Sequence, residues 1–115
     1  AFAMRLKSEI WVQAFMRRCN VEGKYCTVAS RGAAEAGAVF IIVNRLDNRF
    51  HLFGPAPGPA FDENGDRRFV EELPFPANEA DITALLARRK KFDSDLWVVE
   101  VEDRDGTAGI AAAKI

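Results

Sequence analysis

The sequence predicts an α+β domain in which an antiparallel sheet of about four to five strands, built from hairpins, is covered by two helices. Three observations support this fold class. The run from Val39 to Val43 is a series of large apolar residues, mostly β-branched, which is typical of a strand buried on both faces. Apolar residues recur at helical spacing over residues 8–22 and again over residues 78–92. Shorter apolar runs between turn residues supply the other strands, and either helices or a second subunit must cover the two faces of the sheet.

Length and composition indicate one domain. The chain has 115 residues, enough for a single modest core, and we interpret residues 1–115 as a single α+β domain. Residues 1–3 are interpreted as a cloning remnant or a disordered N-terminus, and residues 104–115 as a flexible C-terminal tail.

The charge balance and hydropathy limit the classes of partner. The formal net charge is -1, from 16 basic and 17 acidic residues, which disfavours nucleic-acid binding because that function usually requires a basic excess. The sequence has no run of about 18 apolar residues, and charged residues interrupt its N-terminus too early for a signal peptide. We therefore expect a cytoplasmic protein that has no membrane partner.

The first helix is expected from Ser8 to about Glu22. Ser8 can act as the N-cap, and Gly23 can end the helix as the residue after the C-cap. An extended start is an alternative, because apolar and polar residues also alternate over residues 6–12. The residues expected to form the buried stripe of this helix are Ile10, Trp11, Ala14, Phe15 and Cys19.

The first strand is expected over Tyr25–Ser30, followed by a plain hairpin loop from Arg31 to Gly37 that leads to the central strand. Residues 54–60 contain three prolines, which lack backbone donors, and we expect an extended, exposed connector there. Asn64-Gly65 is the strongest hairpin signal in the chain.

The central strand is followed by Asp47-Asn48, which is compatible with a two-residue type I′ turn. This turn would place Asn44 opposite His51 and Val43 opposite Leu52. Opposed residues share a face of the sheet, so Asn44 and His51 are expected to lie side by side.

The second helix is expected to begin after Asn78, which forms a variant capping box with Asp81. Phe92, at the end of this helix, is expected to pack back on the fold. The last strand is expected from Leu96 to Glu102, with Trp97, Val99 and Val101 on one face.

Several short motifs together resemble the family known as domain of unknown function 1491, which comes mostly from alphaproteobacteria. The resemblance extends from Met4 to about Asp103 and implies short, stand-alone intracellular proteins. It implies no activity and supplies no site residue. The motifs are Arg5-Leu6-Lys7-Ser8-Glu9, Trp11-Val12, Arg17-Arg18, Arg31-Gly32, Ala36-Gly37-Ala38-Val39, Asn44-Arg45-Leu46 and Gly54-Pro55.

Groups for catalysis or metal binding are scarce. His51 is the only histidine, and Cys19 and Cys26 are too far apart in sequence for a zinc knuckle, so no metal site and no cofactor are expected. The two cysteines are expected to be buried, reduced thiols. Glu71 and Glu72 are adjacent, so on a strand they point to opposite faces and cannot share a proton. We therefore predict no catalytic residues.

Two places are candidates for ligand binding. The first is the end of the central hairpin, where Asn44, Arg45 and His51 can form the floor of a small pocket or simply an exposed end of the sheet. The second is the loop that contains Arg31 and Glu35, because loops often carry function.

These observations favour a non-catalytic protein that acts through protein–protein association, and its expected partner is a second copy of the chain or another protein. The alternative is a small-molecule-binding protein or an enzyme that uses the polar cluster at the end of the central hairpin.

Overall fold

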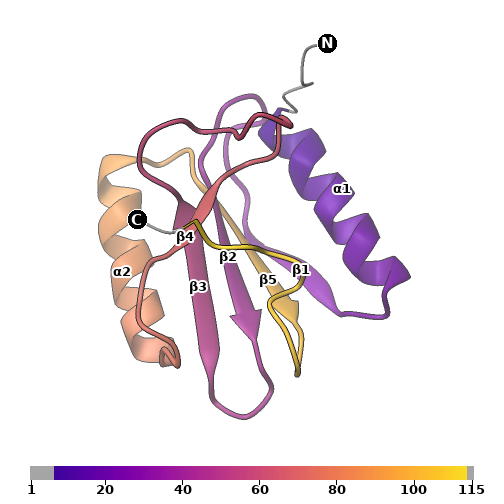
Figure 1. Ribbon diagram of the computed structural model, residues 1–115. Coiled ribbons are helices and arrows are strands. Elements are labelled where there is room, and N and C mark those ends of the chain that lie inside the picture. The colour runs from indigo at the N-terminus through magenta and orange to yellow at the C-terminus, as the bar shows by residue number, and fades with distance from the viewer. Residues whose placement is uncertain (1–6, 114–115) are drawn as a thin grey trace.

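Five strands form one mixed sheet, with one helix on each face (Figure 1). The structure is a computed structural model that describes residues 7–113, so the interpretation of residues 1–3 lies outside the described residues. Within this range no helix is long and apolar enough to cross a membrane. In chain order the elements are α1 (Ser8–Val21), β1 (Cys26–Ser30), β2 (Val39–Asn44), β3 (Phe50–Pro55), β4 (Phe69–Glu71), α2 (Glu79–Phe92) and β5 (Trp97–Glu102).

The strand order is β1-β5-β2-β3-β4, and β2 is parallel to β5. The α+β class is confirmed, but the prediction of a purely antiparallel sheet is wrong, because the last strand inserts between β1 and β2. The loop from Arg31 to Gly37 is therefore not a hairpin connection. It passes the start of β5, where the backbone amide of Ala33 donates a 2.8 Å hydrogen bond to the carbonyl oxygen of Asp95.

The central strand β2 is buried on both faces, as predicted. Ile41 and Val43 face α1 and belong to a core that we call the first core. Phe40 and Ile42 face α2 and belong to the second core. A strand of this kind needs cover on both sides, and the two helices provide it.

Helix α1 covers the first core with a face that shares Phe15 and Cys19 with the predicted stripe, and Trp11 packs against the same core. Its buried residues are Ser8, Val12, Phe15 and Cys19, whereas Ile10 is 49% exposed and Ala14 is exposed. The N-cap is Lys7, and Ser8 is the first helical residue. Gly23 has a φ of 80°, the left-handed conformation expected after the end of a helix.

Helix α2 begins as predicted. The amide of Asp81 donates a 2.8 Å hydrogen bond to Oδ1 of Asn78, and Nδ2 of Asn78 donates to Asp81 in return. Ile82 and Leu85 pack on the second core. Phe92 is 91% exposed, so the prediction that it packs back on the fold is wrong.

The proline-rich connector begins later than expected, because β3 continues through Gly54 and Pro55 and pairs with β4 there. The turn predicted at Asn64-Gly65 is present. Its ends are joined by a 2.8 Å hydrogen bond from the amide of Asp62 to the carbonyl oxygen of Asp66.

Residues 104–113 contact the rest of the fold. Ala108 and Ile110 are buried in the first core. The amide of Ala113 donates a 2.7 Å hydrogen bond to the carbonyl oxygen of Phe69, so this segment runs beside β4 (Figure 1).

Candidate functional site

The hairpin between β2 and β3 closes with a three-residue loop, not with the predicted two-residue turn. The amide of Arg45 donates a 3.0 Å hydrogen bond to the carbonyl oxygen of Arg49, and the loop residues Leu46 and Asn48 have positive φ values of 67° and 65°. The extra residue shifts the predicted register by one position.

The observed pairs are Val43 with His51 and Asn44 with Phe50. The prediction that Asn44 lies opposite His51 is therefore wrong. His51 shares the face of Val43, whereas Asn44 lies on the opposite face of the sheet.

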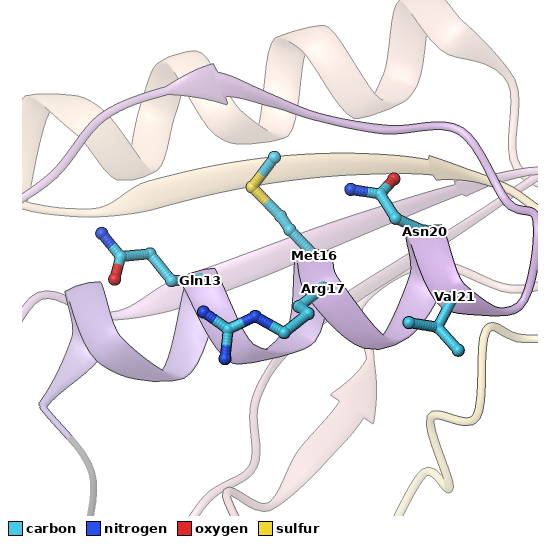
Figure 2. A pocket seen from close by; sticks show the side chains of 5 residues that line it. All are labelled: Gln13, Met16, Arg17, Asn20 and Val21. Carbon is cyan, nitrogen blue, oxygen red and sulfur yellow. The ribbon is translucent and has the colours of Figure 1, made fainter.

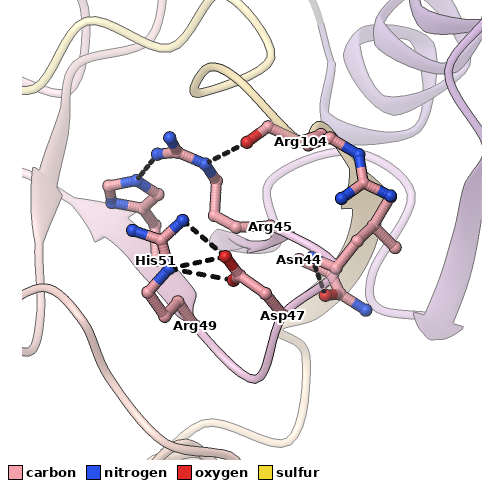
Figure 3. A network of polar contacts seen from close by, with 7 residues as sticks. Asn44, Arg45, Asp47, Arg49, His51 and Arg104 are labelled. Atoms are coloured by element: carbon pink, nitrogen blue, oxygen red, sulfur yellow. Dashed lines mark hydrogen bonds and ion pairs between the residues drawn. The ribbon is translucent and has the colours of Figure 1, made fainter.

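His51 makes a polar contact with each ring nitrogen. Its Nδ1 lies 2.6 Å from Oε1 of Glu71. Its Nε2 lies 3.0 Å from Nη1 of Arg45, the contact that Figure 3 shows. A guanidinium has only donors, so Nε2 must accept from Arg45. The contacts therefore assign the neutral tautomer, in which Nδ1 carries the proton and donates it to the carboxylate of Glu71.

Two aromatic rings enclose the imidazole. Phe75 stacks on His51 at a centroid distance of 4.0 Å and an interplanar angle of 13°, and Phe53 stacks at 5.3 Å and 14°. His51 is consequently only 7% exposed. The imidazole is held as a hydrogen-bonded part of the fold, and neither ring nitrogen is open to a substrate.

Arg45 connects this histidine to the C-terminal segment. Its Nε donates a 2.9 Å hydrogen bond to the carbonyl oxygen of Arg104 (Figure 3). Its guanidinium also lies 5.3 Å from the ring centroid of Phe75. In the adjoining loop Arg49 forms an ion pair with Asp47 at 2.5 Å, and the hydrogen bonds from Arg49 lower the pKa of Asp47. Both of those side chains are exposed, so we assign the pair little stability.

Asn44 belongs to a different environment. Its Oδ1 accepts a 2.8 Å hydrogen bond from the amide of Leu46, and its side chain lies near Glu100. Burial raises the pKa of Glu100, repulsion from Glu79 adds to the rise, and the polar side chain of Asn44 opposes it.

Arg31 and Glu35 lie at the other end of β2. Arg31 forms an ion pair with Glu9, and its guanidinium lies 5.2 Å from the ring centroid of Trp97. Glu35 forms an exposed ion pair with Lys7 at 3.3 Å. Of the five residues proposed from the sequence, the structure thus brings only Arg45 and His51 into contact. That any of the five binds a ligand stays a prediction.

Sequence reasoning missed three members of the histidine cluster: Glu71, Phe75 and Arg104. Glu71 reaches His51 because β4 pairs with β3, a pairing for which the sequence between them gives no direct signal. The prediction that Glu71 and Glu72 point to opposite faces is confirmed, since Glu72 contacts Arg89 of α2 at 2.6 Å.

The other reactive side chains are enclosed as well. Cys19 and Cys26 are free and buried, as predicted. Burial raises the pKa of Cys26 to about 12 and also raises the pKa of Cys19, so both remain thiols at neutral pH. Among residues 7–113 no group of three His, Cys, Asp or Glu side chains is placed to hold a metal ion.

Fold and site together define a small α+β protein with a mixed sheet and an enclosed Glu–His–Arg cluster. The chain belongs to the family described as protein of unknown function (DUF1491), whose model matches residues 6–111. The resemblance found in the sequence motifs is thereby confirmed, and the family description assigns no activity.

Three solved structures are similar over nearly the whole chain. The solution structure of protein Atu0922 from A. tumefaciens is 41% identical, has a TM-score of 0.79, and is matched over 96% of this chain and 98% of that one. The crystal structure of a DUF1491 family protein from Caulobacter crescentus is 37% identical, with a TM-score of 0.74 and coverage of 91% and 92%. An NMR structure of a DUF1491 family protein from the same organism is 36% identical, with a TM-score of 0.73 and coverage of 96% of both chains. No curated protein matches the chain.

Proposed function

We propose that this protein is a non-catalytic cytoplasmic protein that acts through association, and that it forms a homodimer by pairing the edge strand β1 with β1 of a second copy. The enclosure of His51 supports the non-catalytic part of the proposal, because both ring nitrogens already have partners.

The main support for the proposal is that an exposed tyrosine and a surface pocket of matching character both lie along β1. Tyr25, directly before β1, is 65% exposed. On the face of the sheet toward α2, a pocket of about 320 Å³ is lined by Ala29 and Ser30 of β1, Val98 of β5, and Leu86 of α2, among others. The lining is mostly apolar, so an aromatic ring would suit it.

Antiparallel pairing of two β1 strands about Thr27 would bring these features together. Residue 25 of one copy would lie opposite residue 29 of the other, and opposed residues share a face. Thr27 pairs with Glu100 on the α2 face, and Tyr25 and Ala29 follow at alternate positions. Each tyrosine would therefore reach the pocket of the other copy.

The composition of β1 also suits self-pairing. Within the described residues β1 pairs with β5 alone, so one of its edges is free for another strand. Its sequence, Cys-Thr-Val-Ala-Ser, has neither a charged residue nor a proline, the residues that normally prevent edge-to-edge pairing. The pairing of β1 with β5 is regular over residues 26–28 and irregular between Val28 and Ser30, so Ala29 would lie at the margin of the paired β1 strands.

The groove on the adjoining side of α1 would border such an interface. A shallow pocket of about 500 Å³ is lined by residues of α1, and Met16 and Asn20 lie on the side of the helix that is nearer the sheet (Figure 2). Met16 and Val28 both pack at the margin of the first core. The paired strands would thus have apolar surface beside them on both faces of the sheet.

Light scattering coupled to size exclusion, at micromolar protein, tests this proposal. The expected mass is twice the 12.8 kDa of the chain. Tyr25→Ser and Ala29→Glu should each give monomers, because one empties the pocket and the other places a carboxylate in it. Phe92→Ser is the matched control, since it removes an aromatic ring that is 91% exposed elsewhere on the surface. A monomeric wild-type protein would refute the homodimer.

A second candidate function is the binding of a small anionic molecule at the end of the central hairpin. One observation favours it: among the described residues no carboxylate forms an ion pair or a hydrogen bond with Arg45, whose guanidinium donates to His51 and to a carbonyl oxygen. A ligand carboxylate could replace the contact with His51.

A thermal-shift screen against metabolites tests this second candidate. A ligand at 100 times its dissociation constant stabilises a protein by about 2.7 kcal/mol, which is a readily measured shift. Arg45→Met should abolish the response, whereas Arg49→Met should preserve it because Arg49 already pairs with Asp47. Absence of any shift across the library would exclude the candidate.

A further inference from the structure

Arg67 is a half-buried cation without an ionic partner. It lies between the Asn64-Gly65 turn and β4, and its Nη2 donates a 2.8 Å hydrogen bond to Oγ of Ser8. Its Nε is buried and has no hydrogen-bond partner, and among residues 7–113 no carboxylate forms an ion pair with it. Burial lowers the pKa of Arg67, because desolvation of its guanidinium disfavours the charged form.

Aromatic rings hold the guanidinium of Arg67 in place. Its central carbon lies 5.9 Å from the ring centroid of Trp11 and 5.4 Å from that of Phe61. A guanidinium held against two rings keeps its orientation without a carboxylate, and the bond to Ser8 uses only one of its five N–H donors.

A pocket of about 260 Å³ lies beside this guanidinium, between α1 and the C-terminal segment. Trp11 and Arg67 line it, and Arg18 supplies a second guanidinium, whose Nη2 donates a 2.6 Å hydrogen bond to the carbonyl oxygen of Ala108. Two cationic groups with spare donors therefore border one small cavity.

The same pocket also has acidic lining. Asp62 and Asp66, from the two sides of the turn, both contribute to it. Oδ1 of Asp62 is used within the turn, where it accepts hydrogen bonds from the amides of Asn64 and Asp66 at 2.8 and 3.0 Å. Two guanidiniums and two carboxylates give the lining no formal net charge, so it suits a ligand that carries both charges better than a phosphate or another polyanion.

We propose that this pocket binds a small zwitterion of the amino-acid class, with its carboxylate on Arg67 and Arg18 and its ammonium group on Asp66 and Asp62. A fork of two guanidinium donors is the preferred partner of a carboxylate. The cavity is smaller than a typical site for a drug-sized ligand, which agrees with a molecule as small as an amino acid. This inference goes beyond association through β1, because the pocket lies on the α1 side of the sheet near β4.

Titration calorimetry with each of the twenty proteinogenic L-amino acids, up to 10 mM, tests the proposal directly. At least one should bind, and its analogues lacking the amine or the carboxylate should each bind at least tenfold more weakly. Fluorescence gives a second readout, because Trp11 lines the pocket whereas Trp97 is 1% exposed in the first core. No binding of any amino acid would overturn the proposal, and so would binding of inorganic phosphate alone.

Variants test the assignment of each charge. Arg67→Lys keeps the charge but loses the fork, and it should weaken binding at least tenfold. Asp66→Asn, at an exposed position, should weaken binding of the amino acid but not of its analogue lacking the amine. Arg68→Lys is the matched control, because Arg68 donates to the carbonyl oxygens of Pro57 and Pro59 outside this pocket. Equal affinity of all three variants for the amino acid would refute the assignment, and circular dichroism verifies that each variant is folded.

Discussion

The hydroxyl of Ser8 donates a 2.5 Å hydrogen bond to the carbonyl oxygen of Gly37. This bond joins the first turn of α1 to the chain just before β2, and it is fully buried, since Ser8 is 0% exposed. The same oxygen accepts the hydrogen bond from Arg67. One small side chain thus connects the helix, the central strand and the arginine of the proposed pocket.

Ser8→Ala should lower the free energy of unfolding by about 1–3 kcal/mol, because it leaves a buried carbonyl and a guanidinium donor without their partner. Urea denaturation followed by circular dichroism measures the loss. Ser94→Ala, at an exposed position, is the control and should change stability by less than about 0.5 kcal/mol. Equal stability of both variants would show that the buried bond contributes nothing.

Gly37→Ala should destabilise the protein by more than about 2 kcal/mol, since a backbone clash is among the costliest single changes. A Cβ on Gly37 would lie 2.2 Å from the carbonyl oxygen of Asp95 and 3.0 Å from the Trp97 ring. Thermal unfolding compares this variant with Ala34→Gly, an exposed change in the same loop that should cost about 1 kcal/mol or less. A Gly37→Ala protein as stable as wild type would contradict the close approach of this loop to β5.

The imidazole of His51 should be neutral with its proton on Nδ1. Because the chain has one histidine, a long-range ¹⁵N–¹H NMR spectrum reports this ring alone. Arg45→Met should allow the other tautomer to appear, since it removes the donor that holds Nε2 as an acceptor. A wild-type spectrum with the proton on Nε2 would overturn the assigned contacts.

The stability of the fold should decrease as the pH rises from about 9 toward 12. In the unfolded chain Cys26 would ionise near its ordinary pKa of 9.0, whereas in the folded protein burial holds its pKa at about 12. Between these values the folded state binds more protons, so the free energy of unfolding falls with pH.

Urea unfolding at pH 8 and at pH 10 measures this decrease. Cys26→Val should show a smaller decrease over the same interval, because it removes the group that ionises only on unfolding. At pH 8 neither Cys26 nor Cys19 should react with iodoacetamide until the protein is denatured. Rapid alkylation of the native protein would contradict the enclosure of the thiols.

Much of the fold can be predicted from the sequence, because burial leaves a pattern. The run Val39–Val43 indicates a strand covered on both faces, and Asn78 with Asp81 indicates a helix start; both predictions are confirmed. Which strand pairs with which leaves no comparable pattern in the sequence. An apolar run looks the same beside a parallel or an antiparallel neighbour, so the position of β5 between β1 and β2 could not be predicted.

The candidate site was predictable only in part for the same reason. Arg45 and His51 lie close in sequence, and their proximity was foreseen even though the predicted register was wrong. The register depends on Leu46 adopting a positive φ, which is unusual for leucine and cannot be read from residue preferences. Glu71 enters the cluster only through the pairing of β3 with β4, which is a property of the folded sheet.

The insertion of β5 has a consequence for biosynthesis. This strand contacts both β1 and β2 in the middle of the sheet, yet it is the last strand to leave the ribosome. Until Trp97 and its neighbours have been made, the first and second strands have no common neighbour, and their apolar side chains remain open to chaperones. The sheet can therefore be completed only near the end of translation. A chain truncated before β5 would lack an inner strand of the sheet, whereas most truncations of a sheet at its last strand remove an edge strand.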